Sequence, residues 1–438
     1  MCENGKGVYY MVFRIRKNDA LIYSFYGLLL FSVIGYAGYY WYTFYNGITV
    51  YNSFSATSIG DIPTLIVASI IRFFKDFLLL CIFFLYMMKS NKSIRRKLLV
   101  FSAFILCGAF VALLSGYYAS IMGGVRGYLY FFILLVFFSE MKPGVLSLNV
   151  IKNIIYIGII INFLVITEQT LRGTGGLISL VGAGVQRYMG LFGGWAPCSA
   201  FAAAACLFFY VYSTYYTWSK LHIGIAVICS LFIEFMCGSR SGMMCVLLIM
   251  YVWFLKSVPV KRIYKYLAII STLGIVLMGV IKFVEAFADR GSILEIQMQS
   301  GRIMILNQVL NSLWQNPITF LLGNGLGAGS NTSTLMSNFD YNLGAALVLD
   351  GTLNTVLYQY GMFGAVVLLF FLLMMWIKMR NVLFDLKLVF WLIVFIEGIT
   401  SNLFECFACQ IILFITYILM CKGQFFSYDT NNSRVISG

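Results

Sequence analysis

The sequence predicts an all-α polytopic membrane protein with about 12 transmembrane helices. Of its 438 residues, 61% are hydrophobic and 11% are charged, and the mean hydropathy is +0.89. Apolar runs long enough to span a bilayer as helices recur along the chain. The 30 Lys and Arg residues fall mainly in the short loops between these runs. We therefore expect one transmembrane domain, 1–438, and attribute the net charge of +14 to membrane topology rather than nucleic-acid binding.

The apolar runs account for the expected helices in order. They cover residues 21–42, 62–88, 98–116, 125–140, 151–166, 194–217, 221–237, 243–255, 266–284, 352–376, 386–401 and 405–421. Arg14, Arg16 and Lys17 precede the first run, and the densest basic cluster, 89–97, follows the second. Because Lys and Arg accumulate in cytoplasmic loops, both chain ends are expected in the cytoplasm.

The basic residues expected on the outer side are all arginine. They are Arg172, Arg187, Arg240, Arg290 and Arg302. A guanidinium group is planar and binds phosphate oxygens through two parallel hydrogen bonds. Such a set is typical of a site for a diphosphate-bearing ligand at the membrane surface. The alternative is that each arginine pairs with a nearby carboxylate or a helix end.

The longest polar segment, 285–350, is expected to form a large helical loop on the outer side. Within it, 300–314 has helical periodicity, with Ser300 as N-cap and an apolar stripe that should pack on the bundle. The stripe consists of Ile303, Leu306, Leu310, Leu313 and Trp314. The glycine-rich run 323–329 lacks the Gly-Lys-Ser/Thr of a nucleotide-binding loop. We expect it to form a tight turn over a cavity, with backbone N–H groups able to contact sugar or phosphate.

The turn Gly238-Ser239-Arg240-Ser241-Gly242 separates two apolar runs. A guanidinium group at membrane depth is costly unless it faces protein or a wet cavity, so Arg240 is expected to point inward. Ser239 and Ser241 can satisfy exposed backbone groups. The glycines allow close approach of backbone or ligand.

Charged residues also lie within or at the edges of the apolar runs. Arg72 and Asp76 are four residues apart and are expected to form an internal ion pair. Arg126 is expected instead to line a polar groove for a lipid diphosphate. For the remaining acidic residues, both a structural and a functional role stay open; they are Glu234, Glu397 and Glu405.

Cysteine and histidine are not expected to form a metal site in this chain. The 11 cysteines lie mostly within apolar runs, so the C-x-x-C spacing of Cys406 and Cys409 is interpreted as core packing. The one histidine, His222, is expected to be a solvated residue of an inner loop.

Several short motifs follow one another in a characteristic order. They are the turn at 238–242, Ser300-Gly301-Arg302, Trp314 with Asn316-Pro317, the alternating Gly323, Gly325 and Gly327, and Asp350 followed by Gly361 and Gly364; a weaker one is Arg187-x-x-Gly190-x-Phe192. Their order and spacing resemble the O-antigen polymerase and O-antigen ligase superfamily of bacterial inner membranes. The resemblance covers about residues 187–364.

The resemblance implies a glycosyltransferase with a fold similar to GT-C enzymes, acting at the periplasmic face of the inner membrane. Its donor and acceptor would be undecaprenyl-diphosphate-linked oligosaccharides held in membrane lipid, and a polysaccharide chain-length regulator would be a partner. Asp350 would accept the proton of the attacking hydroxyl, and arginines would stabilise the departing diphosphate without a metal or other cofactor. The expected catalytic residues are Asp350, Arg302 and Arg240. The expected substrate-binding residues are Arg187, Arg290, Arg126, Ser239, Ser241, Gly325, Gly327 and Asn354.

Departures from the pattern decide between members of the superfamily. Its ligases usually have histidine where this chain has Asp350, which favours the polymerase. Gly351 replaces the usual asparagine, and Asn354 lies one turn further on. Asp61, in the first outer loop, is the alternative catalytic carboxylate. A lipid-linked oligosaccharide flippase is the alternative from another class, but transporters usually have paired halves, and this sequence shows no such repeat.

Overall fold

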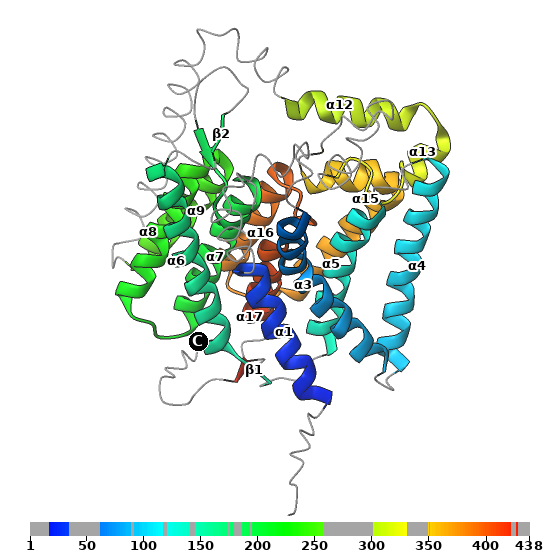
Figure 1. The fold of residues 1–438 in the computed structure, drawn as a ribbon. Coiled ribbons are helices and arrows are strands. Elements are labelled where there is room, and N and C mark those ends of the chain that lie inside the picture. The colour runs from blue at the N-terminus through cyan, green and yellow to red at the C-terminus, as the bar shows by residue number, and fades with distance from the viewer. Residues whose placement is uncertain are drawn as a thin grey trace, which may run out of the picture.

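The computed structural model describes residues 17–34, 62–88, 92–116, 121–140, 145–172, 176–178, 186–192, 195–257, 301–330, 349, 351–421 and 426–427. Its longer helices are α1 Lys17–Val33, α3 Ile62–Met87, α4 Lys92–Leu114, α5 Ile121–Glu140, α6 Leu148–Arg172, α7 Trp195–Tyr215, α8 Lys220–Cys237, α9 Arg240–Ser257, α12 Gly301–Trp314, α15 Thr352–Lys378, α16 Phe384–Thr400 and α17 Phe407–Cys421. The short elements are β1 Leu146–Ser147, β2 Gly176–Ile178, β3 Gln186–Tyr188, η3 Gly190–Phe192, α13 Pro317–Leu322 and β4 Phe426–Ser427. They form the helical bundle of Figure 1.

The structure confirms an all-α membrane protein in outline. Among the described residues, six helices are long and apolar enough to cross a membrane: α4, α5, α6 up to Leu171, α7, α8 and α15. Every predicted apolar run that is described coincides with a helix, although α1 ends at Val33 and the rest of the first run is not described. The run 266–284 lies outside the described residues. The total of 12 spans therefore stays a prediction.

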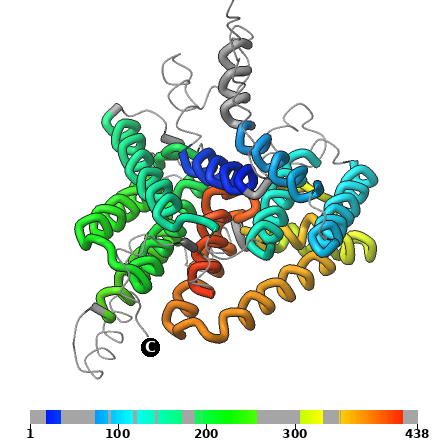
Figure 2. Tube along the Cα trace, turned by 90° about the horizontal axis from the view of Figure 1, so that it is seen from below, coloured from blue at the N-terminus to red at the C-terminus, as the bar shows by residue number. Residues whose placement is uncertain are grey.

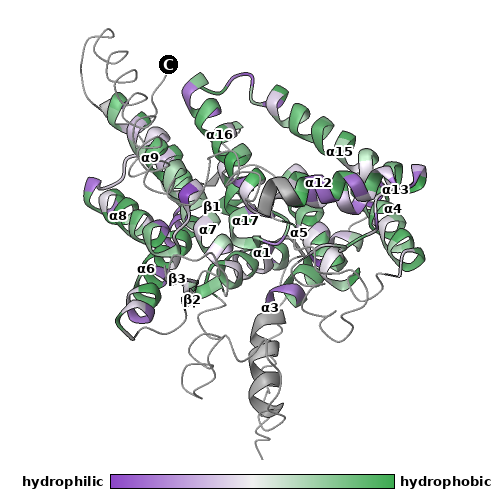
Figure 3. Cartoon of the chain, turned by 90° about the horizontal axis from the view of Figure 1, so that it is seen from above, coloured by the Kyte–Doolittle hydropathy of each residue, from purple (hydrophilic) through white to green (hydrophobic). Residues whose placement is uncertain are grey.

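Two helices, α7 and α17, form the centre of the bundle. Every side chain from Cys198 to Tyr212 in α7 and from Ala408 to Met420 in α17 is buried. Because these side chains are buried on every side, protein rather than lipid surrounds both helices. Figure 2 shows α17 (red) in the middle, with the green helices on one side and the cyan helices on the other. The outward-facing parts of α4, α8 and α15 are largely hydrophobic, as a lipid-facing surface requires (Figure 3).

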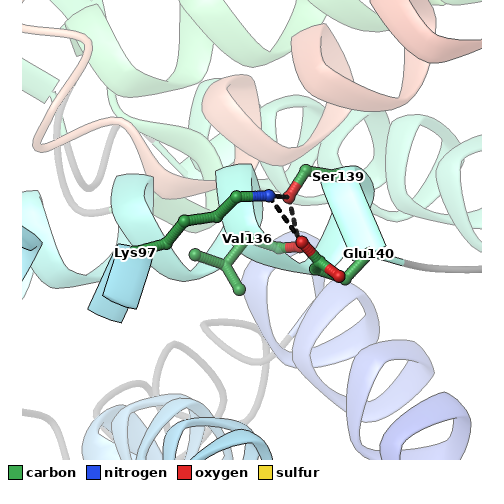
Figure 4. Close-up of polar contacts among 4 residues, drawn as sticks. All are labelled: Lys97, Val136, Ser139 and Glu140. Carbon is green, nitrogen blue, oxygen red and sulfur yellow. Dashed lines mark hydrogen bonds and ion pairs between the residues drawn. The ribbon is translucent and has the colours of Figure 1, made fainter. Parts of the chain in front are cut away.

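Helix ends that the basic residues assign to the cytoplasmic side lie together. Lys97, near the start of α4, contacts the carboxylate of Glu140 at 2.5 Å and the hydroxyl of Ser139 at 3.2 Å, both at the end of α5 (Figure 4). Lys256 at the end of α9 pairs with Asp385 at the start of α16. Strand β1 pairs in parallel with β4 near the C-terminus. We call this the β1 end of the bundle and the opposite end, where α12 and β2 lie, the α12 end (Figure 1).

Helix α15 is broken at Gly361, which has φ 59° and ψ −153°. The backbone at the end of α13, together with that of Gly323, packs into this break. A Cβ on Gly361 would lie 2.6 Å from the carbonyl oxygen of Phe320. An intact helix would use the carbonyls of the preceding turn for its own hydrogen bonds. Here the N–H of Asn324 donates to the carbonyl of Tyr358 at 2.8 Å, and the N–H of Gly325 donates to that of Gln359 at 3.0 Å. A segment remote in sequence, 324–325, therefore supplies the hydrogen-bond donors for the carbonyls of the broken turn.

Replacing Gly361 with alanine should lower the free energy of unfolding by at least about 1–3 kcal/mol, because this backbone region is accessible almost only to glycine. The added Cβ would also clash with α13. Thermal unfolding of the purified protein in detergent measures the effect. Gly224→Ala, in α8, is the matched control because a Cβ there meets nothing within 4 Å. Equal unfolding temperatures for the two variants would contradict this account of the break.

The glycine-rich run 323–329 is packed inside the protein. Gly325 and Gly327 are buried, with φ of 100° and 81°. A Cβ on Gly325 would lie 2.2 Å from the backbone of Ala112 in α4, and the N–H of Leu326 donates to the carbonyl of Gly108 at 2.9 Å. The expected tight turn is present, but the N–H of Gly325 binds Gln359 and is not available to a ligand. The run joins α15 to α4.

The predicted amphipathic helix is α12, and its buried face differs from the predicted stripe. Leu313 is buried as expected, and Val309 is buried beside it against Ala328 and Tyr358. Trp314 is 72% exposed, so it does not pack on the bundle. Ser300 lies outside the described residues.

Candidate functional site

The turn between α8 and α9 owes its shape to its own residues. Gly238 caps α8 in the left-handed conformation, with φ 61° and ψ 28°. The hydroxyl of Ser239 accepts a hydrogen bond from the N–H of Gly242 at 3.3 Å, as a helix N-cap does, and lies 3.3 Å from the hydroxyl of Ser241. Arg240 is exposed. Of the two settings expected for Arg240, protein or a wet cavity, enclosure by protein is therefore wrong.

Arg187 lies against this turn. It is the middle residue of β3, which pairs antiparallel with β2. Its guanidinium carbon lies 4.8 Å from the centre of the Trp195 ring at the start of α7. A Cβ on Gly238 would be 3.3 Å from Cγ of Arg187, so the glycine makes room for the side chain. A cation over an indole face is attracted by the ring, which restricts where the guanidinium lies.

A pair of buried amides in α6 positions the chain beyond Arg187. The N–H of Gly190 donates to Oε1 of Gln169 at 3.1 Å, and Nε2 of Gln169 donates back to the carbonyl of Gly190 at 3.3 Å. The N–H of Leu191 donates to Oδ1 of Asn162 at 2.9 Å. Asn162 and Gln169 are almost fully buried. These bonds fix η3 to α6 and so hold β3 near the turn.

Replacing Gln169 with alanine should lower the free energy of unfolding by about 1–3 kcal/mol, because two buried backbone groups of Gly190 lose their partner. The thermal unfolding midpoint in detergent measures this. Thr167→Ala is the control from the same helix, since among the described residues the Thr167 hydroxyl bonds only the carbonyl of Phe163 within α6. If Gln169→Ala is no more destabilising than Thr167→Ala, the amide pair does not anchor η3.

A carboxylate lies directly behind the turn. Glu234 of α8 is fully buried, and its Oε2 accepts a hydrogen bond from the hydroxyl of Ser199 in α7 at 2.6 Å. A Cβ on Gly242 would lie 2.1 Å from both of these oxygens. The two glycines of the turn therefore have separate tasks: Gly238 makes room for Arg187, and Gly242 makes room for the bond between Ser199 and Glu234.

Arg126 belongs to a second charged group, between α3, α5 and α17. Its Nε donates to Oδ1 of Asp76 at 2.9 Å, and its guanidinium carbon lies 5.0 Å from the centre of the Phe407 ring. The ammonium of the buried Lys75 lies 4.0 Å from the same ring. Asp76 was expected to pair with Arg72, whose side chain is outside the described part of the chain. Asp76 pairs with Arg126, and the expected pair with Arg72 stays a prediction.

The remaining predicted site residues are placed only in part. Arg302 lies in the first turn of α12, but its side chain is not among those described. Asn354 lies in the first turn of α15 and is half-buried. Arg290, Asp61 and Asp350 lie outside the described residues. Of the predicted residues, the structure thus brings together Arg187 and the turn that carries Ser239, Arg240 and Ser241.

Four side chains of this site were missed by sequence reasoning: Trp195, Ser199, Asn162 and Gln169. Asn162 and Gln169 are seven residues apart, which places them on one face of a helix. Two amides on one face of an apolar run were a usable signal. Trp195 had no such signal. Its contact with Arg187 depends on how β3 packs against α7, which local sequence spacing does not predict.

An apolar groove lies between α15 and α16, backed by α5 and α17. It holds about 230 Å³ of free space. Most of its lining is aliphatic or aromatic; the lining residues are Phe131, Thr352, Leu353, Leu368, Leu369, Phe371, Leu372, Met375, Phe390, Trp391, Val394, Phe395, Gly398, Ile399, Leu403, Phe404, Gln410, Leu413 and Phe414.

No protein-family model matches this chain, and no curated protein matches it at a significant level.

Proposed function

We propose that this protein is an O-antigen (surface polysaccharide) polymerase, a membrane glycosyltransferase that joins lipid-diphosphate-linked oligosaccharide repeat units. The observation that carries the proposal is Arg187 over the Trp195 ring and against the turn that bears Arg240. Two arginines at one end of a lipid-facing bundle suit a ligand that has a diphosphate at the membrane surface. The order of the sequence motifs supplies the rest.

The proposed reaction is a displacement at the anomeric carbon of the donor. An acceptor hydroxyl forms the new glycosidic bond, the carbon–oxygen bond to the lipid diphosphate breaks, and the diphosphate leaves with its electron pair. Asp350 takes the proton of the hydroxyl. Arg187, Arg240, Arg290 and Arg302 stabilise the negative charge that develops on the leaving diphosphate, so the proposed reaction uses no metal ion or other cofactor.

The proposed setting is the bacterial inner membrane, with the α12 end of the bundle facing the periplasm. Substrate enters as an undecaprenyl-diphosphate-linked oligosaccharide, which acts as both donor and acceptor. A polysaccharide chain-length regulator is the proposed protein partner. The proposed architecture is a GT-C-like arrangement of about 12 helices.

Deletion of the gene in its own host tests the proposal against its alternatives. A missing polymerase should leave surface polysaccharide with one repeat unit per acceptor, visible by gel electrophoresis. A missing ligase should leave none, while polymer accumulates on its lipid carrier. A missing flippase should leave none and no polymer. Either of the last two outcomes would contradict the proposal.

A further inference from the structure

The apolar surface of α12 is wider than the face that the bundle covers. Val309 and Leu313 are buried against the bundle. Leu310 and Trp314 each follow one of these residues directly in the chain, so they continue the apolar surface around one flank of the helix. Both are exposed, Trp314 the more strongly. Packing within the bundle therefore does not account for this flank.

A tight corner carries the same surface from α12 onto α13. Oδ1 of Asn316 accepts a hydrogen bond from the N–H of Ile318 at 2.9 Å and so caps α13. The ring centres of Trp314 and Phe320 lie 5.1 Å apart across the corner. Ile318 and Leu321 are more than half exposed. The exposed edge of this corner consists of Leu310, Trp314, Ile318 and Leu321.

The exposed edge adjoins the lipid-facing surface of α4. The chain that follows α13 is fastened to this helix, because the N–H of Leu326 donates to the carbonyl of Gly108 at 2.9 Å. At the end of α4, Leu113 and Leu114 are more than half exposed. Figure 1 shows α13 at the upper end of α4, with α12 lying across the top of the bundle. Apolar surface therefore continues from a spanning helix onto the corner.

The segment that carries the exposed edge has no charge. Residues 303–330 contain no Asp, Glu, Lys, Arg or His. The exposed polar side chains of α12 are neutral amides: Asn307, Gln308, Asn311 and Gln315. Exposed apolar patches of this kind mark membrane or protein contacts. Continuity with α4 and the exposed tryptophan, a residue enriched where membrane meets water, favour the membrane.

We propose that α12 and α13 form an interfacial anchor, whose exposed edge inserts among the head groups of zwitterionic phospholipids in the leaflet at the α12 end. An interfacial helix lies in the plane of the membrane, with its apolar side at the boundary between head groups and acyl chains. The outer segment 285–350 then rests on the membrane at 301–322 instead of standing clear of it in water. This inference does not depend on the proposed function, because packing, exposure and charge alone carry it.

The test is fluorescence quenching of the purified full-length protein in nanodiscs of zwitterionic phospholipid. The lipid carries bromine either near the glycerol backbone or near the ends of the acyl chains. Subtracting the spectrum of Trp314→Phe isolates the emission of Trp314, and the phenylalanine keeps an aromatic ring beside Phe320. Shallow bromine should remove most of this emission, and deep bromine should remove much less. Added anionic lipid should leave the result unchanged, because the segment carries no charge.

Two further tryptophan positions, each introduced together with Trp314→Phe, test the edge independently of Trp314. Gln308 and Leu310 lie on opposite flanks of the buried Val309, and both are exposed. The emission added by Leu310→Trp should be quenched by shallow bromine. The emission added by Gln308→Trp, the matched control, should not be quenched.

Failure of shallow bromine to quench both Trp314 and the tryptophan of Leu310→Trp would overturn the proposal. Equal quenching in Gln308→Trp would also overturn it, because the helix would then present no single edge to lipid. If neither edge position is quenched and Trp314→Asp dissociates an oligomer in size-exclusion chromatography, the edge is instead an interface between copies of this chain. Quenching that requires anionic lipid would contradict the choice of zwitterionic lipid. No glycan enters the assay, so its outcome is independent of the polymerase.

Discussion

Replacing Arg187 with alanine should lower the rate of polymerisation by about 100- to 1,000-fold, the usual loss when one donor to a developing negative charge is removed. The guanidinium carbon lies 4.8 Å from the centre of the Trp195 ring and the side chain lies against Gly238, so both neighbours restrict its position before a ligand binds. The measurement is the initial rate of oligosaccharide transfer by purified protein.

Two further variants separate orientation from charge. Arg187→Lys keeps the charge but loses the planar fork, so we expect an intermediate rate. Arg95→Ala removes an exposed arginine from α4 near the β1 end and should leave the rate unchanged. If the activity of Arg187→Ala stays within a factor of about two of wild type, Arg187 does not belong to the site. Losing one hydrogen bond to a charged group would lower the rate by more than this.

Replacing Asp350 with asparagine should lower the rate of polymerisation by about 100- to 10,000-fold, because the side chain keeps its shape but can no longer accept the proton of the acceptor hydroxyl. The same transfer assay measures it. Asp61→Asn is the comparison, since Asp61 is the other carboxylate that the sequence offers. A low rate for Asp61→Asn together with a normal rate for Asp350→Asn would reverse the assignment of the base.

The helices were predictable from the sequence because membrane spans require long apolar runs and because charges mark their ends. The predicted run 62–88 corresponds to α3 at Ile62–Met87, and 221–237 to α8 at Lys220–Cys237. The break in α15 was not predictable. Gly361 lies in an apolar run, and the break depends on donors at Asn324 and Gly325, more than thirty residues away in the chain.

The candidate site was predictable in its residue types but less so in its contacts. Local spacing pointed from Asp76 to Arg72 in its own helix and gave no sign of the bond between Asp76 and Arg126 of another helix. The same limit applies to Arg240. It was expected to point inward because an unpaired charge at membrane depth is costly, and its side chain is exposed in the structure. Helical periodicity identifies neighbours along one helix, whereas these contacts are set by how separate helices pack.

The most direct test of the polymerase is incubation of the purified protein with a defined undecaprenyl-diphosphate-linked oligosaccharide, without nucleotide or metal ion, followed by gel analysis. The proposal predicts a ladder of products spaced by one repeat unit, which Arg187→Ala reduces to trace amounts. Recovery of the substrate unchanged from correctly folded wild-type protein would contradict it.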